Sequence, residues 1–190
     1  MFVCMDWRHI LELTAAGRRL DLPLLNICVW VKSNGGMGTL YRSRHELICV
    51  FKAGDEPYGN NVQLGRFGRG RTNVWEYAGM SSFGSERDEL LASHPTVKPV
   101  ALIADAIRDV TKRGDVVLDT FLGSGSTAIA AEETGRTCFG VELDPSYMDV
   151  AVRRWQKATG CDAVHLGTGH RFDDLATARE IGTRRLVHGG

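Results

Sequence analysis

Residues 116–127 of the chain are Val116-Val117-Leu118-Asp119-Thr120-Phe121-Leu122-Gly123-Ser124-Gly125-Ser126-Thr127. The apolar residues at the start predict a buried strand, and the small residues after them predict a tight turn followed by a helix. Glycines in such a turn let the backbone approach a ligand closely, and a helix N-terminus offers free N–H groups. The segment therefore predicts one strand–turn–helix unit of an α/β protein.

An acidic residue lies where such a unit would use one. Residues 137–141 predict the next strand, and Glu142 ends it. That position is about 20 residues after the first glycine, where a carboxylate can accept hydrogen bonds from both ribose hydroxyls of a nucleoside. The combination predicts a nucleoside-binding site; the alternative is a glycine-rich turn that only allows close packing of a helix on a strand.

Nicotinamide dinucleotides are a second class of ligand that fits this pattern. Gly123-x-Gly125-x-x-Ala128 with Glu142 also satisfies the dinucleotide fingerprint, so an NAD-dependent oxidoreductase is a competing prediction. Two features weigh against it. Four residues separate the strand from the first glycine, and few residues remain after Glu142 for further parallel strands. Those strands would have to lie upstream, in a permuted order.

The remaining periodicity predicts further strands at 2–5, 26–32 and 47–51, and helices at 7–16, 99–112, 127–135 and 145–159. The first helix is expected to end at Gly17. Residues 53–93 lose the periodicity and are rich in Gly, Asn, Arg and Ser, which predicts an irregular insertion. We therefore expect one domain over residues 1–160, made of catalytic-side strands at 1–52, the insertion at 53–93 and a cofactor-binding half at 94–160, followed by a tail at 161–190.

The composition is that of an ordinary globular protein: 43% of residues are hydrophobic, and Lys+Arg 23 balance Asp+Glu 23. Zero net charge argues against a wholly basic nucleic-acid binder, but it leaves room for one basic face. The five cysteines are widely spread without a Cys-x-x-Cys pair, which predicts free thiols and no metal site. Because there is no long apolar run and no signal-peptide pattern, we expect a cytoplasmic protein with no membrane partner.

Three motifs follow one another in the second half of the chain: His94-Pro95-Thr96-Val97-Lys98-Pro99, the glycine-rich turn, and Gly140-Val141-Glu142-Leu143-Asp144-Pro145-Ser146-Tyr147. Together they resemble the motifs of site-specific DNA amino-methyltransferases of the permuted beta group, which modify adenine N6 or cytosine N4. The resemblance implies a Rossmann-like fold with a mostly parallel, doubly wound sheet. It also implies transfer of a methyl group from S-adenosylmethionine to a flipped base of double-stranded DNA, as in restriction–modification.

The resemblance also assigns roles to individual residues. Thr96 and Lys98 would contact the methionine carboxylate side, Phe121 would line the pocket, and Glu142 would bind the ribose. The full set of S-adenosylmethionine-binding residues that it implies is Thr96, Lys98, Asp119, Phe121, Gly123, Ser124, Gly125, Thr127 and Glu142.

The tetrapeptide with which this family holds the target amine, Asp-Pro-Pro-Tyr or a variant with Ser or Asn first, is not found. The chain has five prolines, and no two of them are adjacent. Asp144-Pro145-Ser146-Tyr147 is similar but follows the ribose-binding acid, so we interpret it as a helix N-terminus. In the permuted group the motif would precede Phe2. We therefore expect an N-terminally truncated portion, inactive alone, whose motif comes from a missing N-terminal part or a second chain; a non-catalytic nucleoside- or DNA-binding module is the alternative.

Arginines surround an aromatic residue in Gly65-Arg66-Phe67-Gly68-Arg69-Gly70-Arg71. Such a loop could follow DNA phosphates while Phe67 stacks on a base, although a solvated loop is an open alternative. Further basic residues upstream could line the same groove. The set of expected DNA contacts is Lys32, Arg42, Arg44, Arg66, Arg69 and Arg71.

Overall fold

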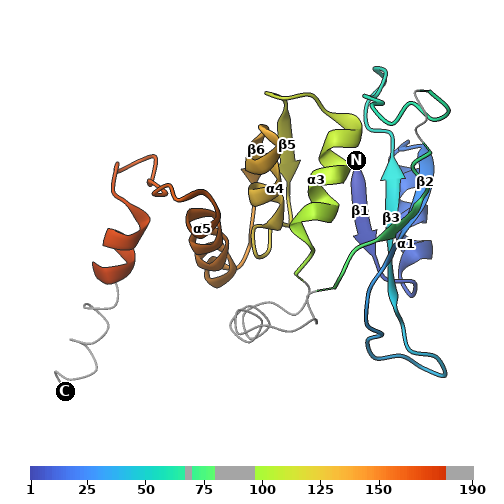
Figure 1. Cartoon of the computed structure of the whole chain (residues 1–190), viewed down its shortest axis with the longest axis horizontal. Coiled ribbons are helices and arrows are strands. Elements are labelled where there is room, and N and C mark those ends of the chain that lie inside the picture. Colours follow the sequence, from blue (N-terminus) through green and yellow to red (C-terminus); the bar gives the residue numbers. More distant parts are fainter. Residues whose placement is uncertain (67–69, 80–96, 179–190) are drawn as a thin grey trace.

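The fold was derived from a computed structural model that describes residues 1–66, 70–79 and 97–178 (Figure 1). Its elements, in chain order, are β1 (Phe2–Met5), α1 (Ile10–Arg19), β2 (Leu24–Val31), β3 (His45–Phe51), β4 (Val74–Glu76), α3 (Val100–Val110), β5 (Val116–Asp119), α4 (Ser126–Thr134), β6 (Thr137–Gly140) and α5 (Pro145–Thr159). Residues 172–178, in the segment that we expected to be a tail, are also helical.

The strands form two sheets rather than one. Four strands lie in the order β1-β3-β2-β4, and β5 pairs with β6 in a separate parallel sheet. The α/β class is confirmed, but the expectation of a single, mostly parallel sheet is wrong, because β3 runs antiparallel to both β1 and β2. The reason is the connection: β2 and β3 are joined by a loop over 32–44, and strands joined without a crossover helix pair antiparallel.

The strand β4 lies inside the segment that we expected to be irregular. It pairs parallel to β2, with Trp75 opposite Trp30, and both indole rings are buried. The ring nitrogen of Trp30 donates to the carbonyl oxygen of Tyr77 at 2.9 Å. Three residues are too few for a periodicity signal, so tertiary pairing alone defines this strand.

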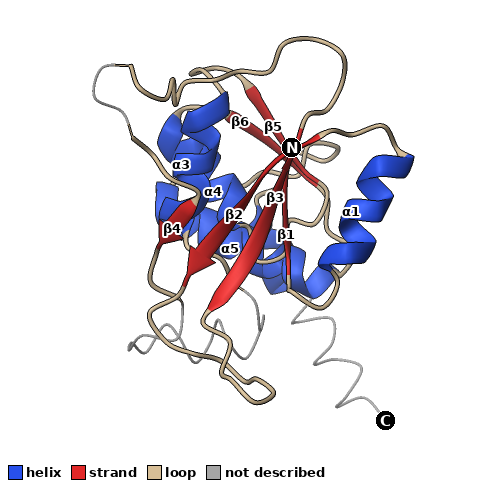
Figure 2. Cartoon of the chain, turned by 90° about the vertical axis from the view of Figure 1, so that its right-hand side faces the viewer, coloured by secondary structure: helices blue, strands red, loops and turns tan. Residues whose placement is uncertain are grey.

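Helices cover both faces of the four-stranded sheet (Figure 2). Successive side chains of a strand point to opposite faces. On one face of β3, Ile48 packs with Trp30 against Leu102 of α3. On the other face, the ring of Phe51 lies against Gly17 of α1. The alternation in β3 therefore fixes which helix covers which face.

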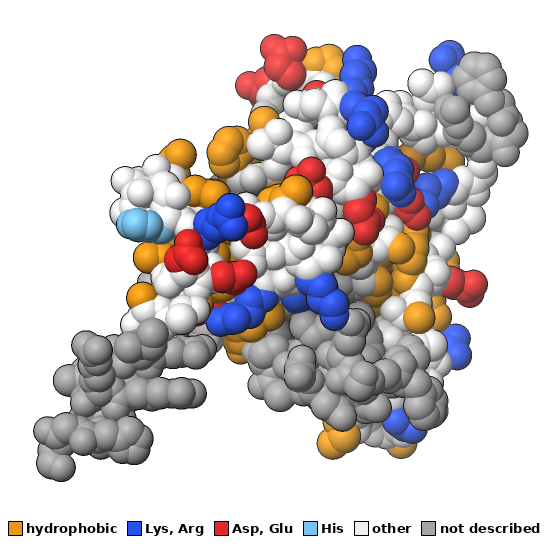
Figure 3. All heavy atoms as spheres, turned by 60° about the vertical axis from the view of Figure 1, so that its left-hand side comes forward, with side chains coloured by type: hydrophobic (Ala, Val, Ile, Leu, Met, Phe, Trp, Pro, Cys, Tyr) orange, Lys and Arg blue, Asp and Glu red, His pale blue; other side chains and the backbone are white. Residues whose placement is uncertain are grey.

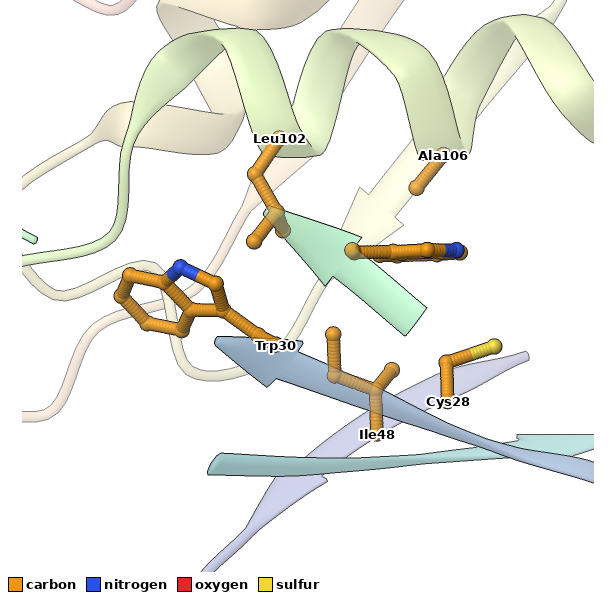
Figure 4. Packing of buried hydrophobic residues seen from close by; sticks show 6 residues of the cluster. Cys28, Trp30, Ile48, Leu102 and Ala106 are labelled. Atoms are coloured by element: carbon orange, nitrogen blue, oxygen red, sulfur yellow. The ribbon is translucent and has the colours of Figure 1, made fainter. Parts of the chain in front are cut away.

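The helix α3 joins the two sheets. Leu102 and Ala106 project from it toward the four-stranded sheet (Figure 4). Its other side carries Ala104 and Ile107, which pack with Ala130 of α4 in a second buried cluster. Burial on two sides explains why α3 is apolar around most of its circumference. The helix places the β5–α4 turn at a fixed position relative to β1–β4.

The small sheet β5–β6 is covered on one face only by the residues that the structure describes. Val117 and Cys138 point inward against α3 and α4. On the outer face Val116, Leu118 and Phe139 are 58%, 67% and 60% exposed. The doubly wound arrangement that we expected is therefore not met in the described part of the chain, although apolar residues on both faces are typical of strands in such a sheet.

Gly17 does not end the first helix, as we had expected. The helix continues to Arg19, with Gly17 buried inside it. A Cβ atom at this position would lie 2.6 Å from a ring carbon of Phe51, so only glycine lets α1 approach β3 this closely. Close packing against an aromatic ring, rather than a helix C-cap, is the reason for the glycine.

Gly17→Ala is expected to destabilise the protein although alanine is the better helix former. Overpacking a core costs about 1–3 kcal/mol, and the gain in helix propensity offsets roughly 1 kcal/mol of that. With a net cost of about 1 kcal/mol, thermal unfolding should show a Tm lowered by about 2–4 °C. The matched control is Ala15→Gly, an exposed position of the same helix, which should cost about 1 kcal/mol by propensity alone. A Tm raised by Gly17→Ala would contradict the packing argument.

Candidate cofactor-binding site

The turn between β5 and α4 is held at both ends by one carboxylate. Asp119 closes β5, and its Oδ1 accepts from the backbone N–H of Phe121 at 3.0 Å. Its Oδ2 accepts from the Thr127 hydroxyl in the first turn of α4 at 2.6 Å. Asp119 and Thr127, both expected at the site, therefore lie together and fix the loop between strand and helix.

Two glycines in this turn have positive φ angles, +54° at Gly123 and +81° at Gly125. The Gly125 N–H donates to the carbonyl oxygen of Leu122 at 3.0 Å, which closes the turn. Gly125 also lies against α5, because a Cβ there would be 2.8 Å from the Cβ of Ala151. At Gly125 the backbone conformation and the close approach of α5 both require glycine. The close approach of a ligand to this turn stays a prediction.

Glu142 reaches back to the turn from the end of β6. Its Oε2 accepts from the backbone N–H of Gly123 at 2.7 Å, and its Oε1 accepts from that of Asp144 at 3.0 Å. An ionised carboxylate offers about four lone-pair sites, so one acid can bind the turn and further partners together. The spacing predicted from the sequence thus brings the acid onto the first glycine of the turn.

Ser124 faces away from solvent, toward a residue that the sequence analysis missed. Arg154 of α5 donates from Nη1 to the Ser124 carbonyl oxygen, to the Ser124 hydroxyl at 2.8 Å and to the Ser126 hydroxyl at 3.2 Å. Both serines are buried. The available signal was helical spacing: Arg154 is three residues from Ala151 and so shares its inward face.

Exposed apolar side chains border the turn. Phe121 is 89% exposed and Leu143, next to Glu142, is 96% exposed. The N-cap residue of α4 is Gly125, so no side chain makes a cap hydrogen bond there. An aromatic ring, a carboxylate and a helix N-terminus without a side-chain cap therefore meet at one place on the surface, which suits a ligand with an aromatic base, hydroxyl groups and an anionic end.

Lys98 is joined to the four-stranded sheet by an acidic residue. Its Nζ lies 3.5 Å from Glu46 Oε1 of β3, while Lys32 Nζ of β2 lies 3.0 Å from Glu46 Oε2. Lys32, an expected DNA contact, also lies over the ring of Trp30 at 4.5 Å. Both lysines thus share one carboxylate. Thr96, the other residue expected beside Lys98, lies outside the described residues.

Arg71, which we expected to contact DNA, is held inside the fold. Its Nε lies 2.8 Å from Asp109 of α3, and its guanidinium lies over the ring of Trp75 at 4.8 Å. Burial raises the pKa of the Asp109 carboxyl above its ordinary value, and the positive charge of Arg71 opposes that rise. The ion pair attaches the strand β4 to α3, so the charge of Arg71 is compensated within the protein.

The other arginines of the expected DNA-binding set are exposed where the structure describes them. Arg42 donates to the carbonyl oxygens of Gly35 and Gly36 in its own loop. Arg44 and Arg66 are exposed, and Arg69 lies outside the described residues. On the face shown in Figure 3, basic and acidic side chains alternate instead of forming one basic field.

Cysteine and metal chemistry have little support in this fold. Burial raises the pKa of the Cys4 and Cys138 thiols to about 11, so both are protonated at neutral pH. In the described ranges no group of His, Cys, Asp and Glu could hold a metal ion. The same residues contain no helix long and apolar enough to cross a membrane.

A parallel strand–turn–helix–strand unit that brings a carboxylate onto its glycine-rich turn is the arrangement found in nucleoside-binding α/β proteins. The model of the DNA methylase family, whose members methylate N6 or N4 amino groups, matches residues 2–153. The chain belongs to that family.

Similar proteins are named type II methyltransferases. The type II methyltransferase M.HinfI of Haemophilus influenzae is 29% identical over 164 residues, which cover 81% of this chain and 45% of that protein. M.ScaI of Streptomyces caespitosus is 34% identical over 87 residues, 46% of this chain and 29% of that protein. The chain thus matches less than half the length of either relative.

Solved structures agree at the level of the fold. The M1.HpyAVI–SAM complex superposes with a TM-score of 0.63 at 25% identity, covering 81% of this chain and 72% of that one. The cytosine-N4-specific PvuII DNA methyltransferase gives 0.61 at 19% identity, covering 78% and 59%, and so shows the shared fold alone. Family membership does not favour the NAD-dependent oxidoreductase or the non-catalytic module.

Proposed function

We propose that this chain provides the S-adenosylmethionine-binding part of a DNA methyltransferase that modifies adenine N6 or cytosine N4. The observation that carries the proposal is the contact of Glu142 with the backbone N–H of Gly123, which sets a carboxylate beside the glycine-rich turn. Membership of the DNA methylase family supports the reaction. We further propose that residues 1–160 form one methyltransferase domain and residues 161–190 a tail.

The described residues fit this cofactor. Glu142 lies beside the turn, where a carboxylate can accept hydrogen bonds from ribose hydroxyls. The exposed ring of Phe121 can pack on adenine or on the methionine chain. The first N–H groups of α4 can receive the carboxylate. Lys98, held by Glu46, would add a positive charge at the methionine end. Asp119 and Thr127 keep the turn in shape and, in this proposal, need not touch the ligand.

S-adenosylmethionine would supply a methyl group bound to a sulfonium sulfur. An exocyclic amine of a base can attack that methyl carbon directly, with the sulfur leaving as a thioether and the amine losing a proton. The described residues orient the methyl donor, and no cysteine nucleophile is required, in agreement with the protonated buried thiols. Holding the amine is the task of the Asp-Pro-Pro-Tyr type of motif. Because that motif is absent from these 190 residues, the proposed activity requires another polypeptide segment to supply it, either an N-terminal part or a second chain.

Calorimetry with S-adenosylmethionine and with NAD tests the proposal on the full chain. We expect saturable one-to-one binding of S-adenosylmethionine and none of NAD at the same concentration. Phe121→Ala should weaken the binding, whereas replacement of the exposed Tyr58, remote in sequence from the turn, should leave it unchanged. Binding of NAD alone, or of neither compound, would overturn the proposed cofactor.

The exposed arginines are proposed to contact DNA phosphates. Each lost contact should reduce the slope of log K against log salt by about 0.9. We expect this change for Arg66→Ala in a titration of labelled duplex DNA between low and moderate salt. Arg19→Ala on α1, equally exposed but across the sheet from α3, is the control and should leave the slope unchanged. An unchanged slope in Arg66→Ala would show that this residue is only solvated.

A further inference from the structure

Arg154 is the described side chain whose position the proposed function leaves unexplained. It lies on α5 and is half-buried, and burial lowers the pKa of its guanidinium. No carboxylate forms an ion pair with it in the described part of the chain. A buried positive charge without a counter-charge is costly unless its hydrogen bonds are made elsewhere.

Those hydrogen bonds all go to the glycine-rich turn. One nitrogen, Nη1, reaches the Ser124 carbonyl oxygen and the hydroxyl groups of Ser124 and Ser126, although the turn is about 30 residues away in sequence. Ala151, one helical turn earlier, fills the space beside Gly125. The face of α5 that carries Ala151 and Arg154 therefore packs against the turn and holds it by hydrogen bonds.

We propose that Arg154 is a positioning residue, which fixes the Leu122–Gly125 turn in its ligand-binding conformation before the cofactor arrives. The inference deepens the proposed function and rests on it. The Ser124 carbonyl lies between the two glycines with positive φ angles, the most adaptable points of the loop. Holding that carbonyl keeps the Gly123 N–H directed at Glu142, so the ribose-binding carboxylate stays in place.

Without Arg154 the turn would sample other conformations, and ligand binding would have to select the competent one. The apparent Kd rises in inverse proportion to the competent fraction. We expect Arg154→Met to raise the Kd for S-adenosylmethionine about 10-fold. Arg154→Lys should recover most of the affinity, because an ammonium group keeps the positive charge and has three N–H donors for the same three oxygens. Arg153→Met is the matched control, since that neighbour is exposed and stacks on Phe172.

Hydrogen exchange of the ligand-free protein distinguishes a local change in the turn from a general loss of stability. In Arg154→Met the amides of Gly123 and Gly125 should exchange faster, while those of β2 and β3 keep their protection. If that variant does not fold, the Ser124→Ala/Ser126→Ala double variant removes two of the three contacts; it should raise the Kd about 3-fold and speed exchange at the same amides.

The outcomes separate the two proposals. If the wild-type chain does not bind S-adenosylmethionine, the proposed function fails, but the exchange experiment still decides whether Arg154 orders the turn. If the wild type binds, and Arg154→Met or the serine double variant binds equally well with unchanged exchange, Arg154 is not a positioning residue. A loss of affinity in Arg153→Met of the same size would also overturn the inference.

Discussion

Incubated with S-adenosylmethionine and DNA, the purified chain is expected to transfer no methyl group above background. The site described above can hold the methyl donor, but no pair of adjacent prolines exists in the sequence to hold the target amine. Correct positioning of two reactants accounts for about 7–11 kcal/mol of a barrier, which is roughly 10⁵- to 10⁸-fold in rate. Without this contribution from positioning, the reaction rate should fall close to the uncatalysed rate.

The measurement uses tritiated S-adenosylmethionine and mixed-sequence duplex DNA, with protein made in a host that lacks DNA methylases. A complete relative such as M.HinfI serves as the positive control. Binding of the cofactor by the same preparation, measured by calorimetry, shows that the chain is folded. Robust incorporation of tritium into DNA would mean that other residues of this chain hold the base and that the role given to the missing motif is wrong.

The second large effect is expected at the carboxylate beside the turn. Glu142→Ala should weaken binding of S-adenosylmethionine by about 10- to 150-fold, because a charge-assisted pair of hydrogen bonds contributes about 1.5–3 kcal/mol. The variant also loses the acceptor for the Gly123 N–H, which lies 2.7 Å from Oε2 in the native site. Ribose contact and turn geometry are therefore both affected.

A smaller change at the same position separates these two causes. Glu142→Gln has the same shape, but its amide presents one acceptor oxygen instead of two, so it should bind with intermediate affinity. Glu133→Ala, at an exposed position of α4, is the control and should bind as the wild type does. Equal affinity of Glu142→Ala and the wild type for S-adenosylmethionine, with a fold shown intact by its Tm, would refute the ribose assignment.

Local sequence patterns determined the elements that carry the site. The strands at Phe2–Met5 and Val116–Asp119 and the helix at Pro145–Thr159 form within a residue of where they were expected. These elements could be predicted because their signals are local. An apolar run, a glycine-rich turn or a proline at a helix start each depends on only a few neighbouring residues. For the same reason the spacing of Gly123 and Glu142 predicted a contact that the fold then makes.

Tertiary structure decided what depends on partners distant in sequence. The strand β4 exists because Trp75 pairs across from Trp30, and Gly17 lies inside a helix because Phe51 packs against it. Arg71 looked like a phosphate ligand among glycines, yet Asp109, far along the chain, pairs with it. No sequence motif marked Arg154 as part of the site, and only the packing of α5 places it against the turn. A side chain's neighbours in the sequence determine its backbone conformation, but only the folded chain determines which charge, ring or carbonyl it meets.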